Sequence, residues 1–181
     1  MLLLTGLEAT GADSARAVQW TTNYYAVTGA NTREIRMSIN QSRPWKERLT
    51  YDGFTEWKVN WRFRSAREGD DCRLIEFQPS AIITTTLPRW TPPPEASPEV
   101  REAWKRYMIG LVQHETVHGR FAYAAVEDMK KKIASLPPMP CEQLKERVNQ
   151  LANGVMDDYR QREKDFDKRT NHGATQGARL H

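Results

Sequence analysis

Cysteine is scarce in this sequence, and long apolar runs are absent. The 181 residues include only Cys72 and Cys141, whose wide separation excludes a C-x-x-C pair that would bind a metal or exchange disulfides. From composition alone, a disulfide and two buried free thiols fit this pair equally well. No stretch approaches the ~18 consecutive apolar residues of a membrane-spanning helix, so we expect no membrane span.

A concentrated basic surface is also missing. The formal net charge is +4, but basic and acidic residues alternate along the chain, as where three lysines at 130–132 follow Glu127 and Asp128. Nucleic-acid-binding domains gather Lys and Arg on one face, so we expect no nucleic-acid partner. The hydrophobic fraction of 39% with 28% charged residues is typical of a globular domain.

The first residues lack a complete secretion signal. Leu2, Leu3 and Leu4 are followed by small residues up to Ala17, which is similar to the end of a signal peptide, but the apolar run is shorter than the ~7–15 residues that such a signal needs. We expect residues 1–17 to be a disordered tail or signal remnant. Residues 18–177 should form one domain and 178–181 a short tail.

Alternation of apolar and polar residues predicts strands in the first half of the chain. Val18–Val27 is rich in β-branched and aromatic residues, and residues 57–63 place Trp, Val, Trp and Phe at every second position. The segment 72–86, which Pro79 interrupts, should complete an antiparallel hairpin. Residues 32–40 favour a short helix capped by Asn31, although a strand also fits.

The second half of the chain is predicted to be helical. A proline-rich connector at 87–98 precedes a helix that starts at Ser97 and Pro98 and runs to about Ser135. A second helix starts near Cys141, and we expect the chain to leave it at Gly173. The fold class is therefore α+β, with residues 18–90 mainly β and 97–170 mainly α, and a small antiparallel sheet packed on two long antiparallel helices.

One short motif carries chemistry. The residues His114-Glu115-Thr116-Val117-His118 match H-E-x-x-H within the first long helix, where side chains four apart face one point. Zinc accepts imidazole nitrogen at ~2.0–2.1 Å, so the pair can fill two corners of a tetrahedron. Glu115 lies beside the metal and can accept a proton from water as a general base. A chance histidine pair on an amphipathic helix is the alternative.

A catalytic zinc site needs a third protein ligand and an open position for water. The longer H-E-x-x-H-x-x-G-x-x-H pattern is absent, because Phe121 and Ala124 stand where its glycine and third histidine would fall. We predict His172, at a Gly-flanked bend, as the third ligand, with Asp167 orienting it. The rival ligands are the acidic residues of the second helix, Asp158, Glu163, Asp165 and Asp167.

Aromatic residues near these elements are expected to serve packing. Trp57 belongs to the apolar face of the predicted strand, with a smaller chance of lining a substrate pocket. Tyr107 and Tyr159 could stabilise a developing oxyanion, but both lie on apolar helix stripes. We therefore favour a core position for all three.

Three segments together carry a family resemblance. They are the HETVH motif, Leu-Pro-Arg-Trp at 87–90, and residues 166–173, in which an aromatic-Asp pair precedes Thr-x-His-Gly at Asp167, Thr170, His172 and Gly173. With them, the chain from about Trp20 to Gly177 resembles a bacterial family of predicted secreted zinc-dependent proteases, which is otherwise catalogued as a domain of unknown function.

The resemblance implies an extracytoplasmic hydrolase, secreted or periplasmic, in which Cys72 and Cys141 form a disulfide. We expect a minimal zincin-like domain with Zn²⁺ between the first helix and the C-terminal segment. The expected function is a metallopeptidase that cleaves peptide or protein substrates with zinc-activated water and Glu115 as the base. The alternative is a non-catalytic binding domain that zinc stabilises.

Overall fold

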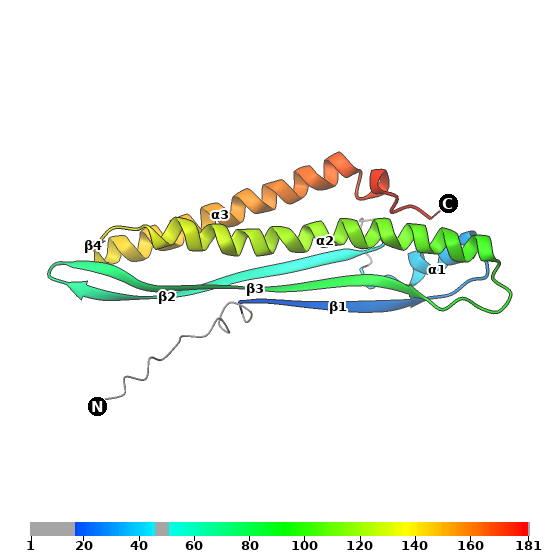
Figure 1. Cartoon of the computed structure of the whole chain (residues 1–181), viewed down its shortest axis with the longest axis horizontal. Helices are drawn as coiled ribbons and strands as arrows, with labels where there is room; N and C mark the ends of the chain where they lie inside the picture. The colour runs from blue at the N-terminus through cyan, green and yellow to red at the C-terminus, as the bar shows by residue number, and fades with distance from the viewer. Residues whose placement is uncertain (1–16, 46–50, 181) are drawn as a thin grey trace, which may run out of the picture.

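The computed structural model describes residues 17–45 and 51–180, which form a mixed sheet and three α-helices (Figure 1). The expected N-terminal tail therefore lies outside the described residues, apart from Ala17. The elements in chain order are β1 (Val18–Val27), α1 (Thr32–Ser42), β2 (Phe54–Glu68), β3 (Asp71–Trp90), α2 (Pro98–Ala134), β4 (Met139–Pro140), α3 (Cys141–Thr170) and the 3₁₀ turn η1 (Ala174–Gln176). The α+β class is confirmed.

The sheet has the order β1-β3-β2, and the two-residue strand β4 pairs with the start of β3. The predicted antiparallel hairpin is confirmed as β2 and β3. An all-antiparallel sheet, however, is wrong, because β1 runs parallel to β3. The chain passes from β1 through α1 before β2 begins, and β1 occupies the edge of β3 that β2 leaves free (Figure 1). Such a crossover is what makes a parallel pair possible.

Two prolines lie inside β3 without breaking a ladder. Successive residues of a strand direct their N–H groups to alternate sides. The N–H of Ala81 points to β1, where it donates to Ala17 O at 2.7 Å, so Pro79 faces the same side just before the first β1 partner. Pro88 faces the other side, beyond the last β2 partner, Phe54 opposite Thr86. β3 therefore continues to Trp90, into the segment predicted as a connector.

The helices begin where the capping residues predict. The side chain of Asn31 accepts a hydrogen bond from Glu34 N at 3.0 Å, which confirms α1 as a helix. Ser97 caps α2 in the same way, with Pro98 at the first helical position. α3 ends at Thr170, three residues before the predicted bend, because Asn171 adopts a left-handed conformation.

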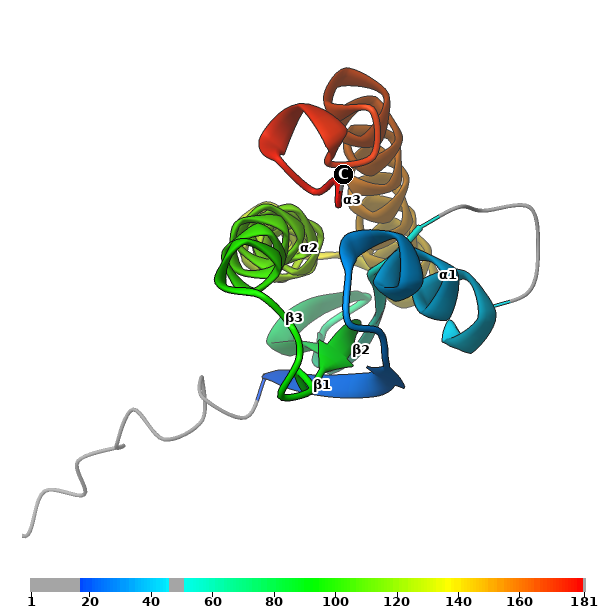
Figure 2. The ribbon, with the colours of Figure 1, turned by 90° about the vertical axis from the view of Figure 1, so that its right-hand side faces the viewer.

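The two long helices are antiparallel and lie on one side of the sheet. α2 extends along the length of β2 and β3, and α3 returns beside it (Figures 1 and 2). A disulfide between Cys72 and Cys141 joins the start of β3 to the start of α3, next to the β3–β4 pairing, which confirms the disulfide. No helix among the described residues combines the length and apolarity needed to cross a membrane.

Two apolar cores flank the H-E-x-x-H motif. One packs α1 and the first half of α2 and includes Ile35, Ile39 and Leu111. The other packs the rest of α2 on α3 and the hairpin and begins on α2 at Ala122. Residues 114–118 lie between them, where polar groups need not displace apolar contacts. Leu180 is buried in the first core, so residues 178–180 pack on the domain and do not form the expected tail.

Candidate metal centre

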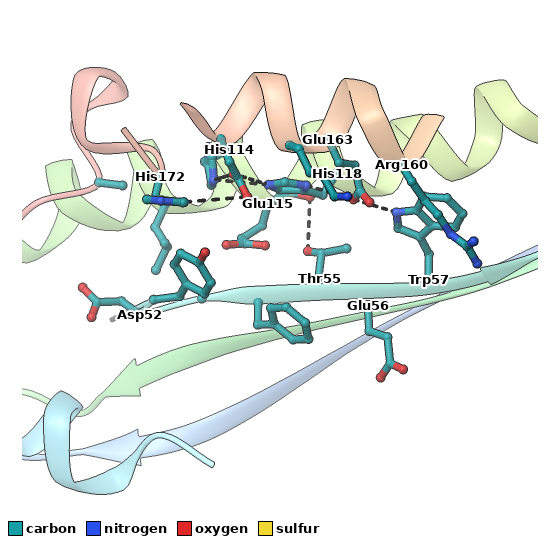
Figure 3. A pocket seen from close by; sticks show the side chains of 17 residues that line it. Asp52, Thr55, Glu56, Trp57, His114, Glu115, His118, Arg160, Glu163 and His172 are labelled. Carbon is teal, nitrogen blue, oxygen red and sulfur yellow. Dashed lines mark hydrogen bonds and ion pairs between the residues drawn. The ribbon is translucent and has the colours of Figure 1, made fainter. Parts of the chain in front are cut away.

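Three possible ligand atoms converge between α2 and α3. The Nε2 atoms of His114 and His118 are 3.3 Å apart, and Oδ1 of Asp167 lies 3.2 Å and 3.0 Å from them, respectively. Zinc bonds of ~2.0–2.1 Å at tetrahedral angles place neighbouring ligand atoms about 3.3 Å apart. The triangle therefore has the dimensions of one face of a zinc tetrahedron. Figure 3 shows the two imidazoles side by side above the sheet.

Asp167 reaches the histidines because it stands in the last turn of α3, which returns antiparallel to α2. Two of the other acidic candidates of this helix are engaged elsewhere. Asp158 binds Arg162 at 2.7 Å, and Asp165 accepts from the Gln161 side chain at 3.0 Å. Among the described residues, the group that could hold a metal is His114, His118 and Asp167.

The second acidic residue in the site, Glu163, orients His118. Its Oε1 accepts hydrogen bonds from His118 Nδ1 at 3.0 Å and from Trp57 Nε1 at 2.7 Å. Because a carboxylate oxygen only accepts, Nδ1 of His118 carries the proton. This contact directs the lone pair of the neutral ring to Nε2, the atom that faces Asp167.

His114 is oriented by a residue that the sequence did not indicate. The side-chain oxygen of Gln176, in η1, lies 2.9 Å from His114 Nδ1 and fixes the same tautomer. The backbone of η1 comes this close because α2 has a glycine at 110, where a Cβ would lie only 2.6 Å from Gln176 O. A glutamine after the helix belongs to no motif, so only the folded chain reveals its role.

His172, the predicted third ligand, lies against Asp167 and not among the three converging atoms. Its Nδ1 is 3.7 Å from Asp167 Oδ2, and its side chain is 45% exposed. Its ring packs on Tyr51 with centroids 4.7 Å apart. His172 and the preceding Asn171 both have left-handed backbones, with φ of 51° and 48°, a strained arrangement that often occurs at functional sites. The predicted contact between Asp167 and His172 is present.

Glu115 lies beneath the imidazoles and is only 4% exposed. Its carboxylate points into the space between α2 and β2 (Figure 3). The hydroxyl of Thr55 donates to its backbone carbonyl at 3.2 Å. A Cβ at position 53 would lie 3.0 Å from both Cγ and Oε1 of Glu115, so Gly53 gives the carboxylate its room.

The charges of the site are strongly coupled. Burial raises the pKa of Glu115 above its usual value. Burial lowers the pKa of His118, but the hydrogen bonds to Asp167 and Glu163 outweigh it and bring the pKa to about 9. Burial also disfavours the charged form of Asp167, yet its hydrogen bonds to His114 and His118 hold its pKa well below the usual range. The metal-free site therefore stores a proton on His118 beside an ionised Asp167.

A sequence model of the family described as "Bacterial protein of unknown function (DUF922)" matches residues 22–173, which is more than half of the chain. The chain belongs to this family. The match to DUF922 includes the H-E-x-x-H motif, Asp167 and His172, and it ends before Gln176. No curated protein and no solved structure matches the sequence.

A pocket of about 400 Å³ opens over the three converging atoms of this DUF922 domain. That volume suits a small ligand or a few residues of a peptide. The residues that line it come from the 51–57 segment, the middle of α2, the last turns of α3 and the C-terminal segment. Residues 54–57 are the first residues of β2. One edge of β2 pairs with β3, and the pocket lies along the other edge.

A buried polar cluster holds the segment that faces Glu115. The carboxylate of Asp52 binds Arg36 at 2.6 Å and accepts from the Tyr107 hydroxyl at 2.9 Å, while its backbone carbonyl accepts from the Tyr25 hydroxyl. These contacts fix Tyr51 and Gly53 on either side of Asp52. Tyr107 is therefore a structural residue, as predicted.

The other two aromatic candidates divide between packing and the site. Tyr159 donates to Asp128 at 2.7 Å and belongs to the core, as predicted. Trp57 packs against the same core and also lines the pocket, where it donates to Glu163. Its position on the strand was predicted from the sequence, but its hydrogen bond to a metal-site residue was not.

Proposed function

We propose that this protein is a zinc-dependent peptidase. The observation that carries the proposal is the triangle of His114, His118 and Asp167 atoms, 3.0 to 3.3 Å apart, with a buried Glu115 beside it in an open pocket. Two neutral imidazoles and one carboxylate are a common donor set of catalytic zinc, and three protein ligands leave the fourth position open. The residues therefore fit the ion.

In this proposal Asp167 and His172 exchange the roles that the sequence suggested. Asp167 supplies the third ligand atom, and His172 stands outside the ligand set, 3.7 Å from the other carboxylate oxygen. A ligand carboxylate is commonly held by such a neighbour. In the same way, Glu163 orients the imidazole of His118, and Gln176 orients that of His114.

Zinc bound here would supply a Lewis acid that polarises a substrate carbonyl and lowers the pKa of a water molecule. Glu115 serves as the general base, and its raised pKa brings it nearer to neutrality, where a base can both take and return a proton. The Tyr51 hydroxyl and the His172 ring line the same pocket and can donate hydrogen bonds to a developing oxyanion.

The edge of β2 offers a way to bind an extended peptide. Residues 54–57 line the pocket on a strand that pairs on one side with β3. A substrate backbone can add to such an edge through main-chain hydrogen bonds, which makes binding largely independent of side chains. The Cys72–Cys141 disulfide supports placement of this reaction outside the cytoplasm, because disulfides persist in oxidising compartments.

The Glu115→Gln variant tests the proposal. We expect hydrolysis of an unfolded protein substrate to fall about 100- to 10,000-fold, the usual effect of a general base, while bound zinc stays near one per chain. Glu102→Gln, an exposed change on the same helix, is the control and should keep full activity. A Glu115→Gln variant with wild-type activity would contradict the proposal. An inactive wild type whose zinc carries a fourth protein ligand would instead support a structural zinc domain.

A further inference from the structure

One stripe of α3 faces the pocket with alternating charge. Arg160, Glu163, Lys164 and Asp167 all line it, and their spacing of three and four residues places them on one face of the helix. The two acidic members are already engaged, Glu163 by His118 and Trp57, and Asp167 by both histidines. The two basic members are Arg160 and Lys164, which we call the basic pair.

The basic pair has little neutralising charge within the protein. Within the part of the chain that the structure describes, the ion-pair partner of Arg160 is Asp157, at 3.6 Å, and the two side chains are 61% and 76% exposed. Such an exposed pair is worth little. Lys164 makes no ion pair with any residue that the structure describes. Both charges are therefore available to a bound ligand.

The opposite wall does not supply the missing negative charge. Glu56 of β2 is paired weakly with Lys58 at 3.8 Å, and Figure 3 shows its carboxylate below β2, on the side away from the helices. Asp52 is neutralised by Arg36. The same view places Arg160 at the Trp57 end of the pocket, far from His172. That end therefore carries positive charge beside a largely apolar ring.

We propose that Arg160 and Lys164 form a carboxylate subsite, so that the preferred substrates are peptides that carry a carboxylate near the cleaved bond. This inference rests on the proposed peptidase function. Lys164 and Arg160 precede Asp167 by three and seven residues, which is ~4.5 Å and ~10 Å along the helix axis. An extended peptide advances ~3.3 Å per residue. The substrate carboxylate that the basic pair binds therefore lies one to three residues from the cleaved bond, on the side of the peptide directed toward Trp57.

The carboxylate can come from an Asp or Glu side chain or from the C-terminus of the peptide. Peptide binding separates these sources and does not depend on hydrolysis. Fluorescent peptides of one length are titrated into the zinc-loaded Glu115→Gln variant, which retains the ligand set. One series carries Glu or Lys at each of the three positions on either side of the centre, with amidated ends. A second, neutral series differs only in a free or amidated C-terminus.

We expect at least one Glu peptide, or the free-acid peptide, to bind about 3- to 20-fold more tightly than its partner, since two partly exposed ion pairs contribute this much. The preference should shrink in 0.5 M salt. The double variant Arg160→Glu/Lys164→Glu should abolish or invert it. The control Lys145→Glu/Arg147→Glu changes charge equally on the same helix, at positions that do not line the pocket, and should retain it.

Equal binding of all peptide pairs, or a preference that persists in the Arg160→Glu/Lys164→Glu variant, would overturn the subsite. Hydrolysis of the same peptides by the wild type reports separately on the peptidase function. A clear binding preference without any hydrolysis would refute the peptidase and leave the carboxylate subsite standing. Hydrolysis whose kcat/KM depends neither on the acidic residue nor on a free C-terminus, in both the wild type and the double variant, would refute only the subsite.

Discussion

At the scale of single residues, the site depends on which acid of α3 meets the two histidines. The H-E-x-x-H motif could be predicted because both rings lie on one helix, where the backbone alone sets their spacing. Asp167 could not be chosen with the same certainty, since its approach depends on the rotation of α3 against α2. The predicted residues His114, His118 and Asp167 come together in the fold, whereas His172 lies beside Asp167 and outside the three converging atoms.

Replacing Asp167 by Asn tests its proposed role. We expect zinc affinity to fall more than about 100-fold, because even the neighbours that orient a metal ligand change affinity 10- to 100-fold. His172→Ala should retain most of the affinity and reduce activity instead. Competition with a fluorescent chelator measures the zinc affinity of both variants. Asp165→Asn on the same turn of α3 is the control. Loss of zinc from His172→Ala alone would restore His172 as the ligand.

The protonation of His118 predicts that zinc binding is linked to pH. The pKa of His118 is raised to about 9 in the metal-free protein, above its ordinary value near 6.5. Its charged form therefore stabilises the metal-free fold fully below pH ~6.5, and this contribution is lost as the pH rises through 9. Zinc requires the neutral ring, so its affinity should increase about tenfold per pH unit from ~6.5 to 9.

Calorimetry in buffers of different ionisation enthalpy measures this linkage. At pH 7.5 we expect about one proton to be released for each zinc bound. The variant Glu163→Gln removes one of the contacts that raise the pKa and should release less. Binding that releases no proton and does not change between pH 7 and 9 would contradict the assignment of His118 as a ligand.

At the scale of elements, close contacts between helix and sheet position the motif. Gly119 follows His118, and a Cβ at this position would lie 2.1 Å from Cη2 of the Trp20 ring. Trp20 is fixed in turn by a hydrogen bond from Nε1 to the Thr85 hydroxyl at 3.0 Å. The glycine therefore lets α2 pass close to the Trp20 ring, one residue after the proposed metal ligand His118.

Alanine at position 119 should consequently destabilise the protein. We expect Gly119→Ala to lower the free energy of unfolding by about 1 to 3 kcal/mol, the usual cost of overpacking, and to weaken zinc binding. Gly154→Ala on α3 is a matched control, because a Cβ there meets nothing within 4 Å and alanine should raise stability by about 0.5 to 1 kcal/mol. Chemical denaturation of both variants measures the difference. Equal stabilisation would show that Trp20 moves aside freely.

The elements themselves were largely predictable, and their arrangement was not. The bounds of β1 agree with the prediction, and α2 ends within one residue of it, because periodicity and caps are local signals. The parallel pairing of β1 with β3 depends on which edge of the hairpin remains free, a choice made only when the sheet assembles. The contact between Gln176 and His114 was not predicted either, because it too forms only in the folded chain.

At the scale of the whole molecule, the disulfide fastens the hairpin to the helices. Cys72 and Cys141 are 69 residues apart. Closing a loop of this length lowers the entropy of the unfolded chain and so stabilises the fold by on the order of 4 kcal/mol at 25 °C. The bond joins β3 and the start of α3, whereas Asp167, the proposed metal ligand, stands at the opposite end of that helix.

The paired variant Cys72→Ser/Cys141→Ser should therefore lose stability without losing the site. We expect the free energy of unfolding to fall by about 2 to 5 kcal/mol, with bound zinc still near one per chain. Urea unfolding and metal analysis of the purified variant give both quantities. A variant that keeps full stability would show that the bond constrains little, and one that binds no zinc would show that the two ends of α3 are coupled.

The position of α3 between these two attachments has a consequence for how the protein would take up its ion. One terminus is fastened covalently, and the other contacts the histidines through Glu163, Asp167 and the segment that follows α3. If the proposed site holds zinc, the metal-free chain could assume its shape first and bind the ion afterwards. Losing the ion would loosen a single end of one helix, and reloading would require no refolding.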